Sequence, residues 1–193
     1  MRSKLRRVHW LATTSLILLL ALGVSTASAT TIVRRSVEEM TRIADEVVQG
    51  TVVGAESRWT DDRQQILTYV TVSATERLKG SDSGDVTFVQ LGGTVGSDFM
   101  FALGTPSFAP GERVVVFLGR MSSVKRLAVP TDRWLLGLGQ GKWSVSNDPV
   151  TGRASARVGL EGARVIERPG RPIETDLDLD QLRARIRAAA TNR

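Results

Sequence analysis

The feature that most constrains the fold of this chain is a long stretch of alternating side chains, which runs from Ile66 to Gly80. Apolar residues recur at alternate positions along much of it, with Thr, Ser and Arg between them from Thr71 onward. A period of two residues is typical of a β-strand with one face on a core and the other in water. Because the stretch exceeds the usual strand of about 5 to 6 residues, we expect it to bend or carry a bulge and to serve two sheets or a barrel corner.

Other segments extend this β pattern. The segment from Val47 to Gly54 is β-branched and broken by glycine, which favours a strand bent or bulged at Gly50. The run from Arg113 to Leu118 is apolar almost throughout, as in strands that are covered on both faces. Further strands are predicted at Val86–Leu91, Lys142–Ser146 and Arg153–Val158.

A helix is predicted on each side of the strands. Ser36 and Glu39 have the spacing of a capping box, and apolar residues at helical spacing follow, so we expect an N-terminal helix over about 36–47. Near the other end, Asp178 is expected to cap an amphipathic helix with its leucines and Ile186 on one face. The arginines of that helix are expected to stabilise its negative end: Arg183, Arg185 and Arg187.

The first 29 residues have the layout of a signal peptide. A basic start leads into a short apolar run, Leu16–Val24, and then into Ala27-Ser28-Ala29, after which we expect cleavage. The alternative, a transmembrane anchor, would need about 20 apolar residues. We therefore expect an exported protein, periplasmic or secreted, with no membrane anchor after cleavage. The pair Arg6-Arg7 leaves the twin-arginine route open beside ordinary Sec export.

Removal of residues 1–29 would leave 164 of the 193 residues, enough for one domain with a substantial core. We assign a β-barrel domain to residues 30–168 and a linker with a C-terminal amphipathic helix to residues 169–193. The predicted fold class is mainly β: an OB-like, partly open antiparallel barrel with an N-terminal and a C-terminal helix.

Cleavage of the predicted signal peptide would also change the net charge of the protein. The whole chain has 26 basic and 20 acidic residues, a formal net charge of +6. The predicted signal peptide contains four of the basic residues and no acid, so the mature chain would carry 22 against 20, or +2. Since no cluster of Lys and Arg is interleaved with aromatic residues, we expect no nucleic-acid partner.

The mature chain would lack both His and Cys, because His9 is the only histidine and there is no cysteine. Its composition excludes Ser-His-Asp and Cys-His catalysis, His general-base chemistry, and zinc sites built from His or Cys. It also excludes a disulfide framework. We therefore expect no catalytic residues, no cofactor and no metal, and the leading hypothesis is a non-enzymatic binding or inhibitory module with an extracytoplasmic protein as its partner.

The candidate binding residues lie in two connections that carry aromatic side chains. Trp59 has cationic neighbours and could anchor a partner, or it could cover the end of its own barrel. A second connection, from Gly92 to Gly111, is rich in glycine and phenylalanine, and long ordered connections often carry function. The six candidates are Arg58, Trp59, Asp61, Arg63, Phe99 and Phe101.

Two other functions stay open. A hydrolase that uses only carboxylates, for example on glycans, would need two of them across a cleft. The candidates for such a pair are Asp61, Asp62, Asp98 and Glu112. A purely structural component of the cell envelope would need no small ligand at all.

Three segments together resemble the netrin-like, or tissue-inhibitor-of-metalloproteinase-like, OB-type barrel family and its bacterial secreted relatives. They are Asp45–Val52, the strand that ends Leu78-Lys79-Gly80, and Phe108–Leu118. The resemblance implies a secreted barrel that binds or inhibits another protein. Inhibitors of that family chelate the zinc of the protease through an N-terminal Cys. This chain has no cysteine, so the chelating mechanism does not carry over.

Overall fold

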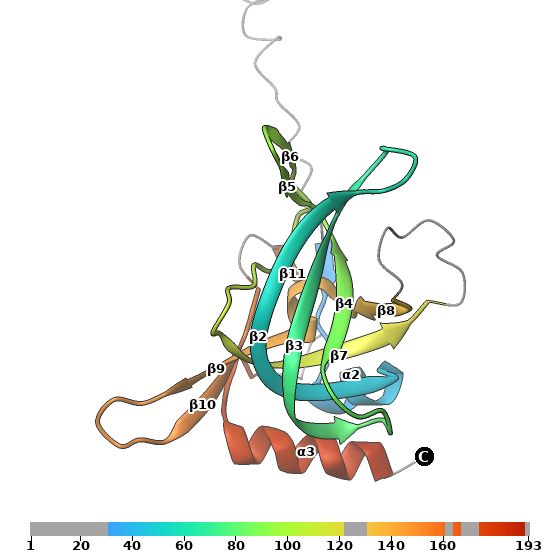
Figure 1. The fold of residues 1–193 in the computed structure, drawn as a ribbon. Coiled ribbons are helices and arrows are strands. Elements are labelled where there is room, and N and C mark those ends of the chain that lie inside the picture. The colour runs from blue at the N-terminus through green and yellow to red at the C-terminus, as the bar shows by residue number, and fades with distance from the viewer. Residues whose placement is uncertain (1–30, 122–130, 161–163, 167–173, 192–193) are drawn as a thin grey trace, which may run out of the picture.

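The computed structural model describes residues 31–121, 131–160, 164–166 and 174–191, drawn in colour in Figure 1. The predicted signal peptide and the start of the predicted linker at 169–173 lie outside these ranges. Among the described residues, no helix combines the length and the apolar character needed to span a bilayer.

Five strands form a closed barrel, shown in Figure 1. Strand β3 lies between β2 and β4, β4 runs parallel to β8, and β7 pairs with both β8 and β2 to complete the circuit. The bounds are β2 Glu46–Trp59, β3 Ile66–Lys79, β4 Val86–Leu91, β7 Arg113–Arg120 and β8 Arg133–Leu135. The prediction of a mainly β, OB-like barrel with a helix near each end is confirmed, although the barrel is closed and not partly open, because β8 joins β4 to β7.

The remaining strands extend or flank the barrel. Beyond β7 the sheet continues through three antiparallel strands, β9, β10 and β12. Two short pairs stand apart from it, the parallel pair of β1 with β11 and the hairpin of β5 with β6. The bounds are β1 Thr31–Val33, β5 Gly93–Val95, β6 Asp98–Met100, β9 Lys142–Asn147, β10 Ala154–Val158, β11 Arg164–Ile166 and β12 Asp176–Asp178.

Two apolar cores meet at β7. One core fills the barrel and contains Phe88 and Leu118, and the other lies outside the barrel under the two helices and contains Phe117 and Trp143. Because neighbouring residues of β7 enter opposite cores, its six residues from Val114 to Gly119 are all buried. The prediction that this apolar run is covered on both faces is confirmed.

The strands β2 and β3 coil tightly around each other, and their pairing shifts at three places. One shift lies between Gln49 and Gly50, so the predicted irregularity at Gly50 is confirmed. A Cβ atom on Gly50 would lie 2.2 Å from the carbonyl oxygen of Ser73. The two backbones can therefore approach this closely only because residue 50 has no side chain.

The first helix, α2 (Val37–Ile43), begins with the predicted capping box: Ser36 accepts from the backbone N–H of Glu39, whose carboxylate accepts from the N–H of Ser36. It ends at Ile43, short of the predicted 47, because Ala44 is extended and Glu46 already pairs with Leu118 of β7. The side chain of Lys79 then donates to the carbonyls of Thr41 and Ala44 at the end of the helix.

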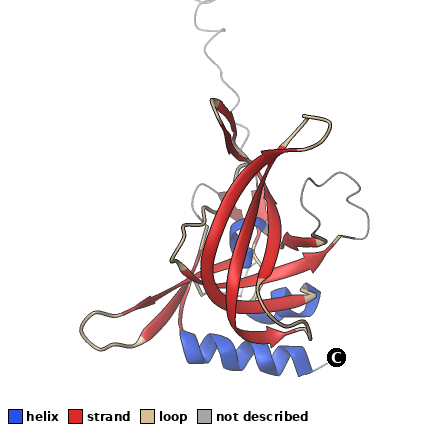
Figure 2. Cartoon of the chain, viewed as in Figure 1, coloured by secondary structure: helices blue, strands red, loops and turns tan. Residues whose placement is uncertain are grey.

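The second helix, α3 (Leu179–Thr191), lies across the base of the barrel at the same end as α2 (Figure 2). Its predicted cap is confirmed, because the Asp178 carboxylate accepts from the N–H groups of Asp180 and Gln181. Its predicted buried face is confirmed as well: Leu179, Leu182 and Ile186.

The predicted role of the α3 arginines was wrong, because none of the three lies in the last turn. They reach other elements instead. The pairs are Arg183 with Gln49 and Glu76, Arg185 with Glu38 and Glu174, and Arg187 with Glu76. The arginines therefore fasten α3 to α2 and to the barrel.

The Glu38–Arg185 pair between the helices makes a testable contribution to stability. The hydrogen bond from Arg185 lowers the pKa of Glu38 from its ordinary 4.5 to about 2. A carboxylate whose pKa is lower in the folded state stabilises the fold above its unfolded pKa and stops doing so as the pH falls through the folded value. The side chain of Glu38 is 39% exposed, so we expect about 1 kcal/mol after solvent screening.

The replacement Arg185→Gln is therefore expected to lower the free energy of unfolding by about 1 kcal/mol at pH 7. The difference from the wild type should shrink between pH 4.5 and about 2, as Glu38 takes up its proton in the wild type. Urea denaturation at several pH values, followed by circular dichroism, measures the loss of stability at pH 7 and its dependence on pH. A difference that is the same at pH 7 and pH 2 would show that Arg185 acts through packing and not through charge.

Candidate functional site

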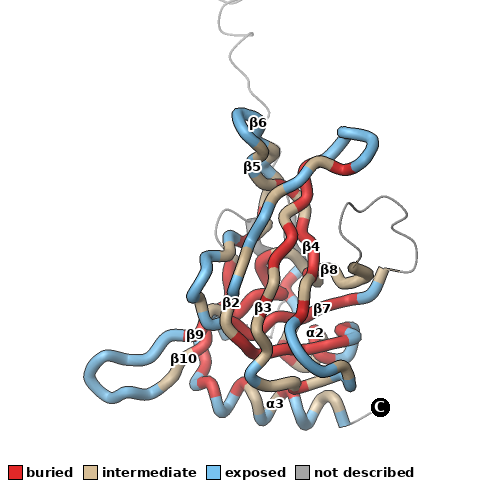
Figure 3. The backbone as a smooth tube through the Cα atoms, viewed as in Figure 1, coloured by how far each residue is buried: buried red, intermediate tan, exposed pale blue. Residues whose placement is uncertain are grey.

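Past its pairing with β7, strand β2 forms the outer edge of the sheet at the end away from α3 (Figure 1). We call this part of β2 and its partner residues on β3 the arm; on its other side, β3 is paired with β4. Strand β2 pairs with β7 only as far as Thr51, and from there it pairs with β3 alone. Figure 3 shows the consequence: β2 is buried in the barrel and largely exposed along the arm.

A bulge at Val53 decides which side chains of the arm face which way. The pairing shifts between Val52 and Gly54, so that Val53 has no partner on β3 and the alternation of faces changes phase. Beyond the bulge, Ser57 lies opposite Thr68, and their hydroxyls are hydrogen-bonded at 2.9 Å. Trp59 therefore shares the face of Ser57, whereas Arg58 lies on the opposite face.

The predicted residues of the arm thus divide between two faces and a turn. Trp59 is half-buried, and Arg58 is exposed and binds Glu56 through two hydrogen bonds of 2.9 and 2.8 Å. These bonds raise the pKa of Arg58 and lower the pKa of Glu56. Asp61 and Arg63 lie exposed in the turn after Trp59, where Arg63 takes a left-handed conformation with φ of 52°.

The hairpin of β5 and β6 brings the two predicted phenylalanines together, Phe99 in β6 and Phe101 directly after its end. The rings of Phe99 and Phe101 are stacked, with centroids 6.2 Å apart and planes 25° from parallel. Phe99 is 68% exposed and Phe101 is 66% exposed. Large apolar side chains with this much exposure are uncommon beside one another on a soluble surface, and they often mark an interaction site.

The hairpin is fastened to the arm by contacts that the sequence did not reveal. The N–H of Gly92 donates to the Ile66 carbonyl at 2.8 Å, and the Ile66 N–H donates to the sulfur of Met100 at 3.4 Å. Thr68 donates to the Gly92 carbonyl at 2.6 Å. Since Ile66 is the β3 partner of Trp59, the structure brings the phenylalanine hairpin to the strand pair that carries Trp59.

A close approach of backbone explains the pair of glycines at the start of the hairpin. A Cβ atom on Gly93, whose φ is +139°, would lie 2.2 Å from the Ser57 hydroxyl and 2.4 Å from that of Thr68. Any larger residue would push the hairpin off the arm. Adjacent glycines in the sequence were the available signal for this contact, although glycine alone does not say which backbone approaches.

The carboxylates considered for a hydrolase lie on three parts of the fold: Asp61 and Asp62 in the turn between β2 and β3, Asp98 in β6, and Glu112 just before β7. Asp62 accepts from Thr60 and from the N–H of Gln64 and so shapes the turn of the arm. Glu112 binds Lys142 at 2.6 Å and Ser144 at 2.7 Å. Burial would raise the pKa of Glu112, but these two hydrogen bonds outweigh it and lower the pKa. Asp61 and Asp98 are exposed.

A network of charged residues near the start of β2 was not foreseen from the sequence. The Glu46 carboxylate is 3% exposed and accepts from Arg77 at 2.9 Å, from Arg120 at 2.8 Å and from Arg133 at 2.9 Å. Arg120 and Arg133 also bind Asp82, and the hydrogen bond from Arg120 lowers the pKa of that carboxyl. The network ties β2, β3, β7 and β8 together at the helix end of the barrel.

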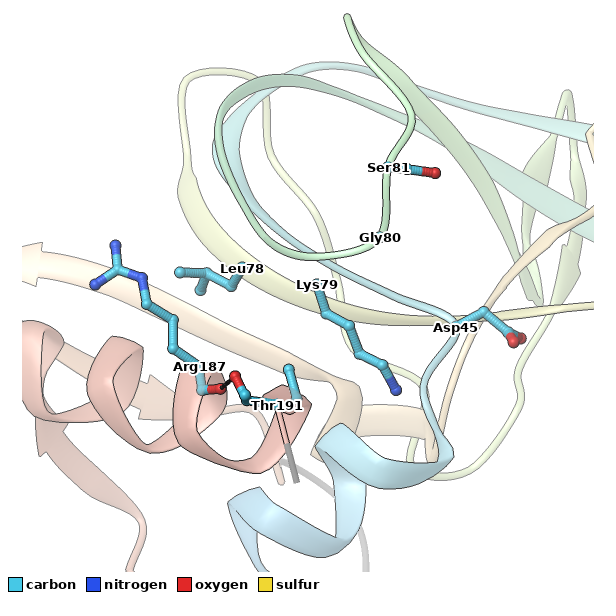
Figure 4. A pocket seen from close by; sticks show the side chains of 8 residues that line it. Asp45, Leu78, Lys79, Gly80, Ser81, Arg187 and Thr191 are labelled. Atoms are coloured by element: carbon cyan, nitrogen blue, oxygen red, sulfur yellow. Dashed lines mark hydrogen bonds between the residues drawn. The ribbon is translucent and has the colours of Figure 1, made fainter. Parts of the chain in front are cut away.

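A hollow of about 640 Å³ also lies at the helix end, between the end of β3 and the last turns of α3 (Figure 4). Its charged groups have partners within the protein. Lys79 donates to the end of α2, Arg187 binds Glu76, and Asp45 accepts from the N–H of Arg120. In Figure 4, Arg187 and Asp45 point to opposite sides, so the hollow does not gather reactive groups around one point.

Comparisons with known proteins identified no relative of this chain. Searches against models of protein families, curated proteins and solved structures found no match to this chain.

Proposed function

We propose that this chain is an exported, non-catalytic binding module that uses the β5–β6 hairpin, which is held against the arm, to bind an extracytoplasmic protein. The observation that carries the proposal is the stacked and exposed pair of Phe99 and Phe101 on the β5–β6 hairpin. Aromatic residues, phenylalanine included, are enriched in protein–protein interfaces. Connections at the ends of OB-type barrels are also where these folds hold their ligands.

The way the hairpin is held supports this proposal. Two hydrogen bonds join Gly92 to Ile66 and Thr68, so the aromatic pair sits on an ordered support. A surface that is already ordered loses less conformational entropy when a partner binds. Trp59 lies on the strand pair to which the hairpin is fastened, opposite Ile66.

The charged clusters support a non-catalytic function. The Glu46 network and the Glu112–Lys142 pair are satisfied by partners within the fold, as structural ion pairs are. Inhibition of a protease is the form of binding that the family resemblance suggests. It would here depend on aromatic contacts, since the chain has no cysteine with which to chelate zinc.

The double replacement Phe99→Ser with Phe101→Ser is expected to remove most of the binding, because it deletes the exposed aromatic pair and no core contact. Tagged wild-type and variant proteins are used to capture partners from the extracytoplasmic extract of the source cells, and each captured protein is quantified. At least about a tenfold loss is expected for the specific partner, given the usual cost of removing such residues.

The matched control is Val150→Ser. Val150 is 90% exposed at the tip of the β9–β10 hairpin, which projects from another side of the molecule (Figure 1). This change removes an exposed apolar side chain away from the arm, and it should leave capture unchanged. Equal recovery of every partner by the wild type and the Phe99/Phe101 variant would refute the proposal, and recovery of polysaccharide would favour the hydrolase.

A further inference from the structure

The arm carries a strand edge with which no described strand pairs. The last backbone contacts of β2 on the β7 side are made by Val52, which donates to the Glu112 carbonyl and accepts from the N–H of Gly111, both at 2.8 Å. From Gly54 to Trp59 the register with β3 is regular, and within the described ranges no backbone hydrogen bond reaches the other edge of this stretch.

The backbone hydrogen bond at the end of the arm shows which N–H and C=O groups of β2 point away from β3. The N–H of Thr60 donates to the Gln65 carbonyl, so the backbone groups of Thr60 point toward β3. In an antiparallel pair these directions alternate from residue to residue. The N–H and C=O groups of Ala55, Ser57 and Trp59 therefore point outward, and such an edge is a template for another strand.

We infer that this edge pairs with the same edge of a second copy of the chain, antiparallel and with Ser57 opposite Ser57. A contact between two identical edges related by a two-fold axis must be self-complementary. In this register Glu56 of each copy lies opposite Arg58 of the other, and Ala55 lies opposite Trp59. The backbone groups of Glu56 and Arg58 point away from the other copy, so these two residues would form a non-hydrogen-bonded pair. In such pairs the side chains of opposite strands come closest.

Other registers fit less well. If Ala55 lay opposite Ala55, Arg58 would meet Val52, whose outward backbone groups already bind Gly111 and Glu112. If Trp59 lay opposite Trp59, Glu56 would meet Asp62 and two like charges would face each other. The register centred on Ser57 alone of these three matches opposite charges on both sides of the axis.

The contact would consist of main-chain hydrogen bonds and exposed charge pairs. The Ser57 pair contributes two hydrogen bonds, and each pair of Ala55 with Trp59 contributes two more. The charges stay near solvent, because Glu56 and Arg58 are both exposed. We therefore expect a weak dimer that dissociates further as the salt concentration rises.

Charge replacement tests the register. In Glu56→Arg, positions 56 and 58 are both arginine, so arginines of one copy would face arginines of the other. In Arg58→Glu, both positions are glutamate, so glutamates would face glutamates. Each variant alone is expected to dimerise at least about tenfold more weakly than the wild type. An equimolar mixture of the two variants should form a mixed dimer, since the two arginines of one copy then face the two glutamates of the other. Sedimentation equilibrium at low salt, up to millimolar protein, measures both.

The replacement Ala55→Pro tests the backbone contact without changing a charge. It deletes an N–H that points outward, so the monomer should stay folded, and proline is tolerated at such edge positions. Dimerisation should be lost, whereas Ala55→Ser, which keeps the N–H, should dimerise like the wild type. Thermal unfolding verifies that both variants are folded.

A wild-type chain that stays monomeric throughout this range would overturn the inference, as would a dimer that the charge variants do not weaken or a mixture that does not associate. The last two outcomes would mean that the copies meet elsewhere, and a monomer would leave the edge open to an extended segment of another protein. The proposed function rests on the exposed rings of Phe99 and Phe101 and not on pairing at this edge, so a negative result would leave the proposed function unaffected.

Discussion

Replacing Glu46 with glutamine is expected to lower the free energy of unfolding by about 3 kcal/mol or more. Glu46 is buried and holds three guanidinium groups, those of Arg77, Arg120 and Arg133. Glutamine has nearly the same volume, but it lacks the charge and offers an NH₂ group to a guanidinium that can only donate. Removing one partner from a buried ion pair commonly costs about 3 to 5 kcal/mol because the other charges remain without compensation. Urea denaturation followed by tryptophan fluorescence measures the loss.

The matched control for this variant is Asp176→Asn. Asp176 and Arg157 also form an ion pair, at 2.9 Å, but both side chains are exposed. Exposed pairs contribute about 0 to 1 kcal/mol, so this replacement should have little effect. If both variants lost the same amount, the burial of Glu46 would not be the cause of its contribution.

The replacement Gly50→Ala is expected to cost about 3 kcal/mol or more, because the added methyl group would overlap the β3 backbone. Its Cβ would lie 2.2 Å from the Ser73 carbonyl oxygen and 2.6 Å from a methyl group of Val72. The strands would have to separate at the point where β2 bends around the barrel, and the hydrogen bonds of both would be strained. Thermal unfolding should show a clearly lower midpoint.

The same strand provides the control, Gly54→Ala. A Cβ atom on Gly54 would meet nothing within 4 Å, and the backbone of this residue does not have positive φ. Alanine also restricts the unfolded chain more than glycine does, so we expect a neutral or slightly stabilising change of up to about 1 kcal/mol. A similar loss at both positions would indicate a general intolerance of β2 to side chains and not a steric contact at Gly50.

The molecule has two ends of different character. At the helix end, charged groups are paired with one another across β2, β3, β7 and the helices, and these pairs stabilise the fold. At the arm end, stacked aromatic rings face the solvent, and one edge of β2 has no strand partner among the described residues. The two proposals concern separate parts of the arm end: the β5–β6 hairpin is proposed to bind a partner protein, and the β2 edge is proposed to bind a second copy.

Much of the fold could be predicted from short-range patterns. The alternation from Ile66, the apolar run from Arg113 and the capping box at Ser36 each depend on residues within a few positions of one another, and each element formed as expected. The end of α2 was predicted less well, since pairing of Glu46 with β7 ended the helical pattern early. Long-range pairing outweighed local propensity there.

By itself, the sequence determined the mainly β class, the helix caps, the irregularity at Gly50 and the absence of chemistry that needs His or Cys in the chain after residue 29. Only the tertiary structure decided which groups meet. Glu46 finds Arg120 and Arg133 at separations of 74 and 87 residues, and the phenylalanine hairpin reaches Ile66 across 34 residues. Such partners depend on strand order and register. A single bulge at Val53 reverses the faces of the arm, and a period of two residues cannot show where such a reversal occurs.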